Sequence, residues 1–107
     1  MTKEKPLILT IKKKWFDMIK NGIKKEEYRE LNRYYDSRFD NHFYKGRVLT
    51  PNYIIFRNGY RKDSPKIKCL CDLAQGVGNP EWGAEPDKIY YILEILSVEE
   101  VVIYENK

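Results

Sequence analysis

Residues 22–29 read Gly22-Ile23-Lys24-Lys25-Glu26-Glu27-Tyr28-Arg29, and one kind of secondary structure gives way to another here. Apolar side chains precede Gly22 at helical spacing, and glycine readily takes the left-handed conformation that ends a helix. The residues that follow alternate as in a strand, so Glu27 and Arg29 share one face. Lys24 lies at the junction, where a turn sets its direction. We therefore expect Lys24, Glu27 and Arg29 to converge just beyond a helix end.

This combination of side chains suits a polar, planar ligand. A carboxylate accepts hydrogen bonds from an amino group. A guanidinium offers a fixed fork of donors to a carbonyl or a phosphate. The alternative is a structural ion network around the helix end, and networks of this kind on a surface often contribute less than about 1 kcal/mol.

The motif also carries a family resemblance. Gly22-x-Lys24-x-x-Glu27-x-Arg29 resembles the GxKxxExR signature of the ASCH family, whose fold is PUA-like. The segments at residues 15–19, 56–60 and 80–83 resemble a subgroup of uncharacterised bacterial and phage members. ASCH domains are about as long as this chain, so the resemblance implies a single domain over residues 1–107. It also implies a small PUA-like β-barrel with a cleft where the motif leaves the helix.

Length and composition indicate one globular domain. The chain has 107 residues, of which 42% are hydrophobic and 34% charged, and this balance is typical of a folded protein. No apolar run approaches the roughly 20 residues of a membrane span, and the first residues do not form a signal peptide. We therefore expect a cytoplasmic protein with no membrane partner. Its oligomeric state stays open.

The charges are unevenly distributed along the chain. Residues 1–68 carry a net charge of +10, whereas residues 69–107 carry −6. Such a basic half is typical of a surface that meets nucleic acid, although a solvated surface without a partner has the same pattern.

No metal, cofactor or disulfide is expected. Cys69 and Cys71 would lie on one strand face near the upper distance limit for a disulfide, so we expect them to be reduced and half-buried. The single histidine, His42, cannot complete a four-ligand zinc site, and we expect it on the surface or at a helix end.

The order of elements predicts an α+β fold with about five or six strands and two helices near the N-terminus. Helices are expected over residues 12–21 and 33–43, the second capped by Asn32 and packed through Leu31, Tyr35, Phe39 and Phe43. Strands are expected over residues 7–11, from the motif to about 31, and over 53–56, 67–74 and 89–96, with 98–104 as a further strand or a bulged continuation. Loops are expected over residues 44–52, 57–66 and 75–87.

Two loops contain further candidate ligand-binding residues. Arg57 and Tyr60 are typical of a loop that clamps phosphates, or of a solvated hairpin. Trp82 stands in a glycine-rich loop, where it either packs as a lid or stacks on a base.

Three functions fit these observations. The first is a domain that binds single-stranded RNA or a nucleoside or nucleotide, in which Lys24 and Arg29 meet phosphate or carbonyl oxygens and Glu27 accepts from a base amino group. Tyr60 or Trp82 would stack on the base. The second, implied by the ASCH resemblance, is a metal-independent hydrolase: an amidohydrolase of acetylated cytidine with Lys24 and Glu27 as catalytic residues, or a ribonuclease. The third is a protein-interaction domain.

The hydrolase reading departs from the family pattern. The deacetylating relatives have a hydroxyl residue where this chain has Glu27, together with a separate glutamate, for which Glu81 is the candidate. A paired Glu27 would raise the pKa of Lys24 and oppose its use as a base.

Overall fold

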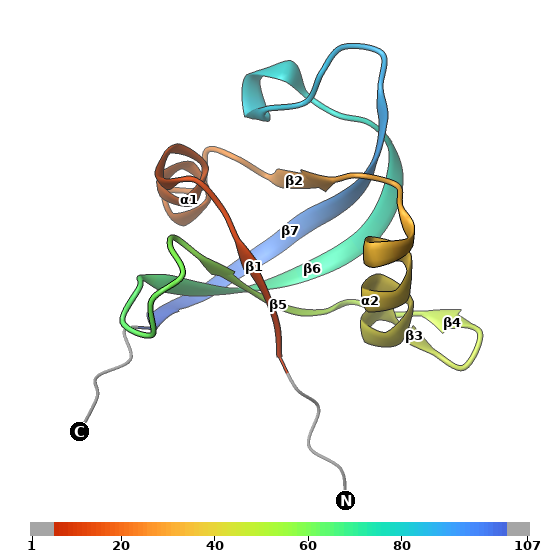
Figure 1. Cartoon of the computed structure of the whole chain (residues 1–107), viewed down its shortest axis with the longest axis horizontal. Helices are drawn as coiled ribbons and strands as arrows, with labels where there is room; N and C mark the ends of the chain where they lie inside the picture. The colour runs from red at the N-terminus through yellow and green to blue at the C-terminus, as the bar shows by residue number, and fades with distance from the viewer. Residues whose placement is uncertain (1–5, 103–107) are drawn as a thin grey trace, which may run out of the picture.

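The computed structural model describes residues 6–102 and has an α+β fold built on a curled five-stranded sheet. Along the chain it contains β1 (Leu7–Thr10), α1 (Lys13–Lys20), β2 (Glu26–Arg29), α2 (Arg33–Phe43), β3 (Tyr44–Lys45), β4 (Val48–Leu49), β5 (Asn52–Arg57), β6 (Lys66–Val77), the 3-10 turn η1 (Pro80–Trp82) and β7 (Ile89–Val102). The sheet order is β1-β5-β6-β7-β2, with β1 parallel to β5 and the other neighbours antiparallel. The sheet curls into half of a barrel (Figure 1), which confirms the expected α+β, barrel-like class.

The strands β1 and β2 form the two edges of this sheet. They come from the first 29 residues of the chain and are joined by α1, which lies beside them (Figure 1). We call the opening between these two edges the seam.

The long strands β6 and β7 shape the sheet. Their register shifts twice, between Lys68 and Cys69 and between Leu70 and Cys71, and each shift leaves an additional residue on β7. Such bulges bend a strand and increase its twist, which helps the sheet to curl.

The observed limits of β6 and β7 differ from the expected strand and loop boundaries. Residues 89–96 and 98–102 form one bulged strand, the second of the two expected alternatives, and residues 103 and 104 lie outside the described residues. The loop expected from residue 75 begins later, because residues 75–77 still pair with β7.

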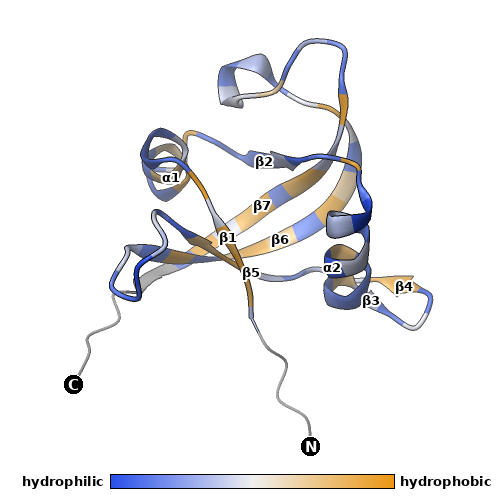
Figure 2. Ribbon diagram, viewed as in Figure 1, coloured by the Kyte–Doolittle hydropathy of each residue, from blue (hydrophilic) through white to orange (hydrophobic). Residues whose placement is uncertain are grey.

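The main core lies between the sheet and the two helices. Its fully buried side chains include Phe39 and Phe43 of α2 and Ile19 of α1. In Figure 2 the apolar residues concentrate on the central strands, while the helices also show polar segments. The predicted helix over residues 33–43 and its Asn32 cap are confirmed, since Asn32 Oδ1 accepts from Tyr35 N at 3.0 Å. Leu31 was expected in the core but is 43% exposed, because the helix begins after it.

The segment over residues 44–52, expected to be a loop, contains a short hairpin. Tyr44 pairs with Leu49 and Lys45 with Val48, and Gly46 has a φ of +65° in the turn. Strands of two residues are too short to give an alternating pattern, so the sequence did not reveal them. The separate two-stranded sheet lies beside α2 (Figure 1).

Within residues 6–102, no helix has the length and apolar character needed to cross a membrane.

The two cysteines are free and fully buried on the core face of β6, not half-buried as expected. Ile67 and Leu73 share that face with them, so their burial follows from the strand's alternation. Burial raises the pKa of Cys69 to about 12 and raises the pKa of Cys71 as well. Both thiols are therefore protonated at neutral pH.

We expect neither thiol to react with an alkylating reagent in the folded protein at pH 8, because the thiolate is the reactive form and both sulfurs are buried. Mass spectrometry of the native protein should show no adduct, and two adducts should form in denaturant. Rapid labelling of the native protein would contradict this packing.

Candidate functional site

The site begins where α1 ends. Gly22 takes a φ of +77°, its N–H donates to Ile19 O at 3.0 Å, and the N–H of Lys24 donates to Met18 O at 3.0 Å. This left-handed ending confirms the role expected for Gly22 and turns the chain sharply toward β2. The turn directs Lys24 back toward the strand that follows it.

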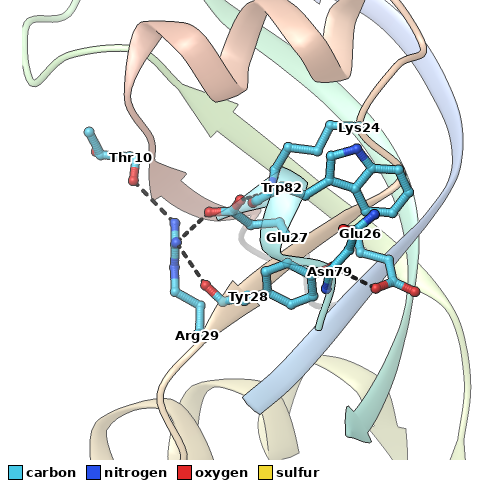
Figure 3. A network of polar contacts seen from close by, with 8 residues as sticks. All are labelled: Thr10, Lys24, Glu26, Glu27, Tyr28, Arg29, Asn79 and Trp82. Atoms are coloured by element: carbon cyan, nitrogen blue, oxygen red, sulfur yellow. Dashed lines mark hydrogen bonds and ion pairs between the residues drawn. The ribbon is translucent and has the colours of Figure 1, made fainter. Parts of the chain in front are cut away.

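Lys24, Glu27 and Arg29 meet as the sequence predicted (Figure 3). Glu27 Oε1 lies 3.2 Å from Lys24 Nζ, and Glu27 Oε2 lies 2.5 Å from Arg29 Nη1. Arg29 Nη2 also donates to Thr10 O at 3.1 Å. Because Thr10 ends β1 and Arg29 ends β2, this guanidinium spans the seam between the two edge strands.

Lys24 is almost completely buried. It is 1% exposed, and its ammonium donates to Trp82 O as well as contacting Glu27. The ammonium also lies 4.8 Å from the ring centroid of Trp15 and 4.9 Å from that of Tyr28. Two acceptors and two aromatic faces therefore replace the water that this cation loses.

Burial lowers the pKa of Lys24, and the charge of Glu27 opposes this effect without cancelling it. The increase expected from pairing with Glu27 is thus present but smaller than the effect of burial.

A cleft of about 390 Å³ opens in the seam above this network. We call it the seam cleft. It is lined by Thr10, Ile11, Lys12, Trp15, Glu27, Tyr28, Arg29, Glu30, Trp82, Gly83, Glu85 and Tyr90. Its volume is within the range of small-ligand pockets, roughly 300–1,000 Å³. Among the predicted residues, Glu27, Arg29 and Trp82 line it, whereas Lys24 lies behind Glu27 and does not.

The loop over residues 78–86 forms one wall of the seam cleft and is fastened at several points. Asn79 N donates to the hydroxyl of Tyr28 at 2.8 Å, and Trp82 O accepts from Lys24. Gly83, with a φ of +101°, packs so closely on Trp15 that a Cβ atom would lie 2.9 Å from the indole ring. Gly78 packs in the same way on Tyr28, with 2.7 Å between a Cβ and the ring. The wall is therefore held against β2 and α1.

Arg57 and Tyr60 lie in a separate depression of about 270 Å³, which we call the arginine–tyrosine pocket. It is lined by Ile8, Leu9, Thr10, Arg29, Tyr34, Tyr35, Arg57 and Tyr60. It shares Thr10 and Arg29 with the seam cleft, so the contact between these two residues divides the two depressions.

Sequence reasoning did not identify every carboxylate of the seam cleft. Glu30 and Glu85 line it, and Lys88 contacts them at 2.8 and 3.4 Å. The hydrogen bond to Glu30 raises the pKa of Lys88. By the two-residue period of a strand, Glu30 would lie on the face opposite Glu27, and no spacing rule relates Glu85 to the motif. Glu81, considered as a second carboxylate, is exposed and outside the residues that line the cleft.

Two other expectations concern groups away from the cleft. His42 lies near the end of α2, as expected, with Nε2 2.6 Å from Tyr53 O. Among the side chains that the structure describes, no three of His, Cys, Asp or Glu are grouped so that they could hold a metal ion.

Replacement of Gly78 by alanine tests the packing of the cleft wall. Because a Cβ would overlap the Tyr28 ring and Ala84, we expect Gly78→Ala to lower the free energy of unfolding by about 1–3 kcal/mol. Gly76→Ala is the matched control, since its Cβ would meet only Ile92 Cδ1 at 3.5 Å. Equal melting temperatures for the two variants would contradict the close contact.

Replacement of Lys24 by methionine tests the buried ammonium. Loss of the Lys24 ammonium leaves Glu27 Oε1 and Trp82 O without a partner, although Glu27 Oε2 keeps Arg29. We therefore expect Lys24→Met to lower the free energy of unfolding by about 3 kcal/mol.

The difference in the free energy of unfolding between the wild type and Lys24→Met should increase as the pH rises. The pKa of Lys24 is below 10.5 in the folded protein, so between that lowered pKa and 10.5 the unfolded chain binds more protons at this residue. The wild type therefore gains stability with rising pH relative to Lys24→Met. Denaturant unfolding of both proteins at neutral pH and near pH 10 measures the change, and a narrowing gap would contradict the lowered pKa.

Comparison with known proteins finds no matching family model, no matching curated protein and no matching solved structure. The function is therefore argued from the chemistry of the seam cleft.

Proposed function

We propose that the protein binds a nucleobase of a nucleotide, or of single-stranded RNA, in the seam cleft. The observation that carries this proposal is the placement of Glu27 and Arg29 among aromatic side chains in one cleft of about 390 Å³. Trp15, Tyr28 and Trp82 supply the aromatic surface there. A carboxylate, a guanidinium and rings together match the edge and the faces of a base.

The polar pair suits a base that presents an amino group beside a carbonyl oxygen. Each oxygen of Glu27 already contacts one cation, and a carboxylate oxygen has a second lone pair for a further donor. Arg29 Nη1 already donates to Glu27 and to Tyr28 O, and Nη2 donates to Thr10 O, which leaves one N–H of Nη2 for a carbonyl oxygen of the base. Cytosine carries both groups, so cytidine is the probe of choice.

The aromatic side chains supply the remaining affinity. Stacking on an aromatic side chain contributes roughly 1–3 kcal/mol per base. Trp82 is half-buried, and its carbonyl is fixed by Lys24. The role proposed for Lys24 is thus to hold Glu27 and the Trp82 segment in place, not to contact the ligand.

The charges beside the cleft favour an anionic partner. Lys12 lines the cleft, and Lys13 and Lys14 follow it at the exposed start of α1. Lys88 contacts the carboxylates of both Glu30 and Glu85, and its single charge offsets one of the two. A single-stranded nucleic acid that places a base in the seam would pass these lysines, and its binding would weaken with salt.

We also propose that the chain is a member of the ASCH family. Two features support this: the Gly22-x-Lys24-x-x-Glu27-x-Arg29 motif follows a helix end and lines a cleft through Glu27 and Arg29, and the sheet has the shape of half a barrel. The resemblance implies a pocket that faces the motif and RNA as the ligand. A cytoplasmic location is proposed separately from it.

A hydrolase of acetylated cytidine is the second candidate. One observation favours it: burial lowers the pKa of Lys24 despite the contact of its ammonium with Glu27. Its burial and its hydrogen bond to Trp82 O oppose a direct role, because the ammonium would first have to leave that carbonyl. The third candidate function is a protein-interaction domain, in which the ion network of Lys24, Glu27 and Arg29 has only a structural role.

A titration with cytidine, acetylated cytidine and single-stranded RNA distinguishes these functions, with tryptophan fluorescence and chromatography as readouts. We expect Glu27→Gln to weaken cytidine binding about tenfold, the equivalent of one charge-assisted hydrogen bond. Trp82→Leu should weaken it by a similar factor through lost stacking. Glu94→Gln is the control, since Glu94 is an exposed carboxylate on β7 outside the seam cleft.

Cytidine or RNA binding that is lost in Glu27→Gln and Trp82→Leu, with no product, supports the binding function. Release of acetate that stops in Lys24→Met would establish the hydrolase. No binding of any ligand by the folded wild type would reject both functions.

A further inference from the structure

We propose that the arginine–tyrosine pocket is an anion subsite for the phosphate of the nucleotide whose base lies in the seam cleft. This inference rests on the proposed function and deepens it, because it makes a phosphorylated nucleoside the preferred ligand over the free nucleoside. The two depressions share Thr10 and Arg29, so one ligand can occupy both across the contact between these residues.

The charge of the pocket is one-sided. None of its eight lining residues is a carboxylate, whereas two of them, Arg29 and Arg57, are arginines. The charge of Arg29 is matched by Glu27 at 2.5 Å. Arg57 has no carboxylate within 4.0 Å among the described residues. An uncompensated cation in a polar hollow attracts an anion and repels a second cation.

The guanidinium of Arg57 is held in place but keeps donors free. Its Nη2 and Nε contact Thr10 Oγ1 at 3.2 and 3.4 Å. No acceptor engages its other N–H groups among the side chains and backbone groups that the structure describes. Thr10 therefore orients the fork at the boundary of the two depressions, and a fork of two parallel N–H groups matches two oxygens of a phosphate.

Three tyrosines complete the pocket, at positions 34, 35 and 60. No hydrogen bond engages their hydroxyl groups within the described part of the chain, and a phenol donates readily to a phosphate oxygen. The guanidinium carbon of Arg38 lies 3.4 Å from the ring centroid of Tyr34. This adds a further positive charge beside the lining. Tyr60 is 84% exposed, so its ring can close over a bound anion.

A terminal phosphate and an internal phosphodiester share this chemistry. The volume of about 270 Å³ is enough for either group. Their comparison identifies the source: a nucleoside monophosphate presents more charge, about −1.5 to −2, than a diester linkage does. If Arg57 holds a terminal phosphate, cytidine 5′-monophosphate should therefore bind more tightly than a dinucleotide that carries the same base.

The experiment titrates wild type, Arg57→Gln and Arg61→Gln with three probes: cytidine, cytidine 5′-monophosphate and the dinucleotide cytidylyl-cytidine. Arg61 is the matched control because it lies in the same loop, its side chain is 87% exposed, and it contacts Asp63 outside both depressions. We expect the monophosphate to bind wild type about tenfold more tightly than cytidine, since a hydrogen bond to a charged group contributes on this scale. Arg57→Gln should abolish this advantage of the monophosphate over cytidine, and Arg61→Gln should keep it.

Tyr60→Phe provides a second variant that removes only an exposed hydroxyl and leaves the fold intact. It should reduce the advantage of the monophosphate about threefold. Tighter binding of the dinucleotide than of both cytidine and the monophosphate, lost in Arg57→Gln, assigns the subsite to an RNA phosphodiester. Tighter binding of the monophosphate than of both cytidine and the dinucleotide assigns it to a terminal phosphate.

Failure of the subsite and failure of the proposed function give different results. Equal affinities for cytidine and both phosphorylated probes would overturn the subsite and leave the proposed function standing. If cytidine does not bind, a titration with inorganic phosphate, followed by NMR of the Arg57 side chain, tests the anion subsite by itself. A saturable shift of Arg57 Nε supports the anion subsite alone, and no shift overturns it.

Discussion

Glu27 lies between two cations, Lys24 and Arg29, and only 5% of it is exposed. Taking ions out of water costs several kcal/mol per ion, so such a group is stable only when every charge keeps close partners. Lys24 keeps Glu27, the carbonyl of Trp82 and two aromatic rings. Arg29 keeps Glu27 and Thr10 O. The network thus fastens β1, β2 and the loop of Trp82 to one carboxylate, and the cleft exists because these three segments are held apart and fixed.

The position of this network follows from the topology of the sheet. The edge strands β1 and β2 are not neighbours in the sheet, so their edge groups need other partners. Arg29 supplies one by reaching Thr10 O, and its guanidinium then separates the seam cleft from the arginine–tyrosine pocket. The side chain of Arg29 therefore supplies a partner to the edge strand β1, orients the carboxylate of Glu27 and separates the two depressions. This explains how a small sheet can offer an acceptor on one side and, on the other, a cation that has no carboxylate partner in the described part of the chain.

The sequence predicts elements whose signals are local. Helix α2 begins and ends where Asn32 and the aromatic spacing of Phe39 and Phe43 place it. The meeting of Glu27 with Arg29 follows from the two-residue period of a strand. Contacts between residues far apart in the sequence were not predictable. The buried ammonium of Lys24 donates to the carbonyl of Trp82, 58 residues away, and Arg57 contacts Thr10, 47 residues away, at the boundary of the cleft. The bulges that keep β7 continuous likewise leave no local pattern.

Lys24 is a buried support of the site and not one of its exposed groups. NMR of the lysine side chains measures this directly. A protected Lys24 ammonium should exchange slowly with water, and its neighbouring methylene protons should be shifted upfield by the rings of Trp15 and Tyr28. Rapid exchange and unshifted methylene signals, as for the exposed Lys13, would contradict the account.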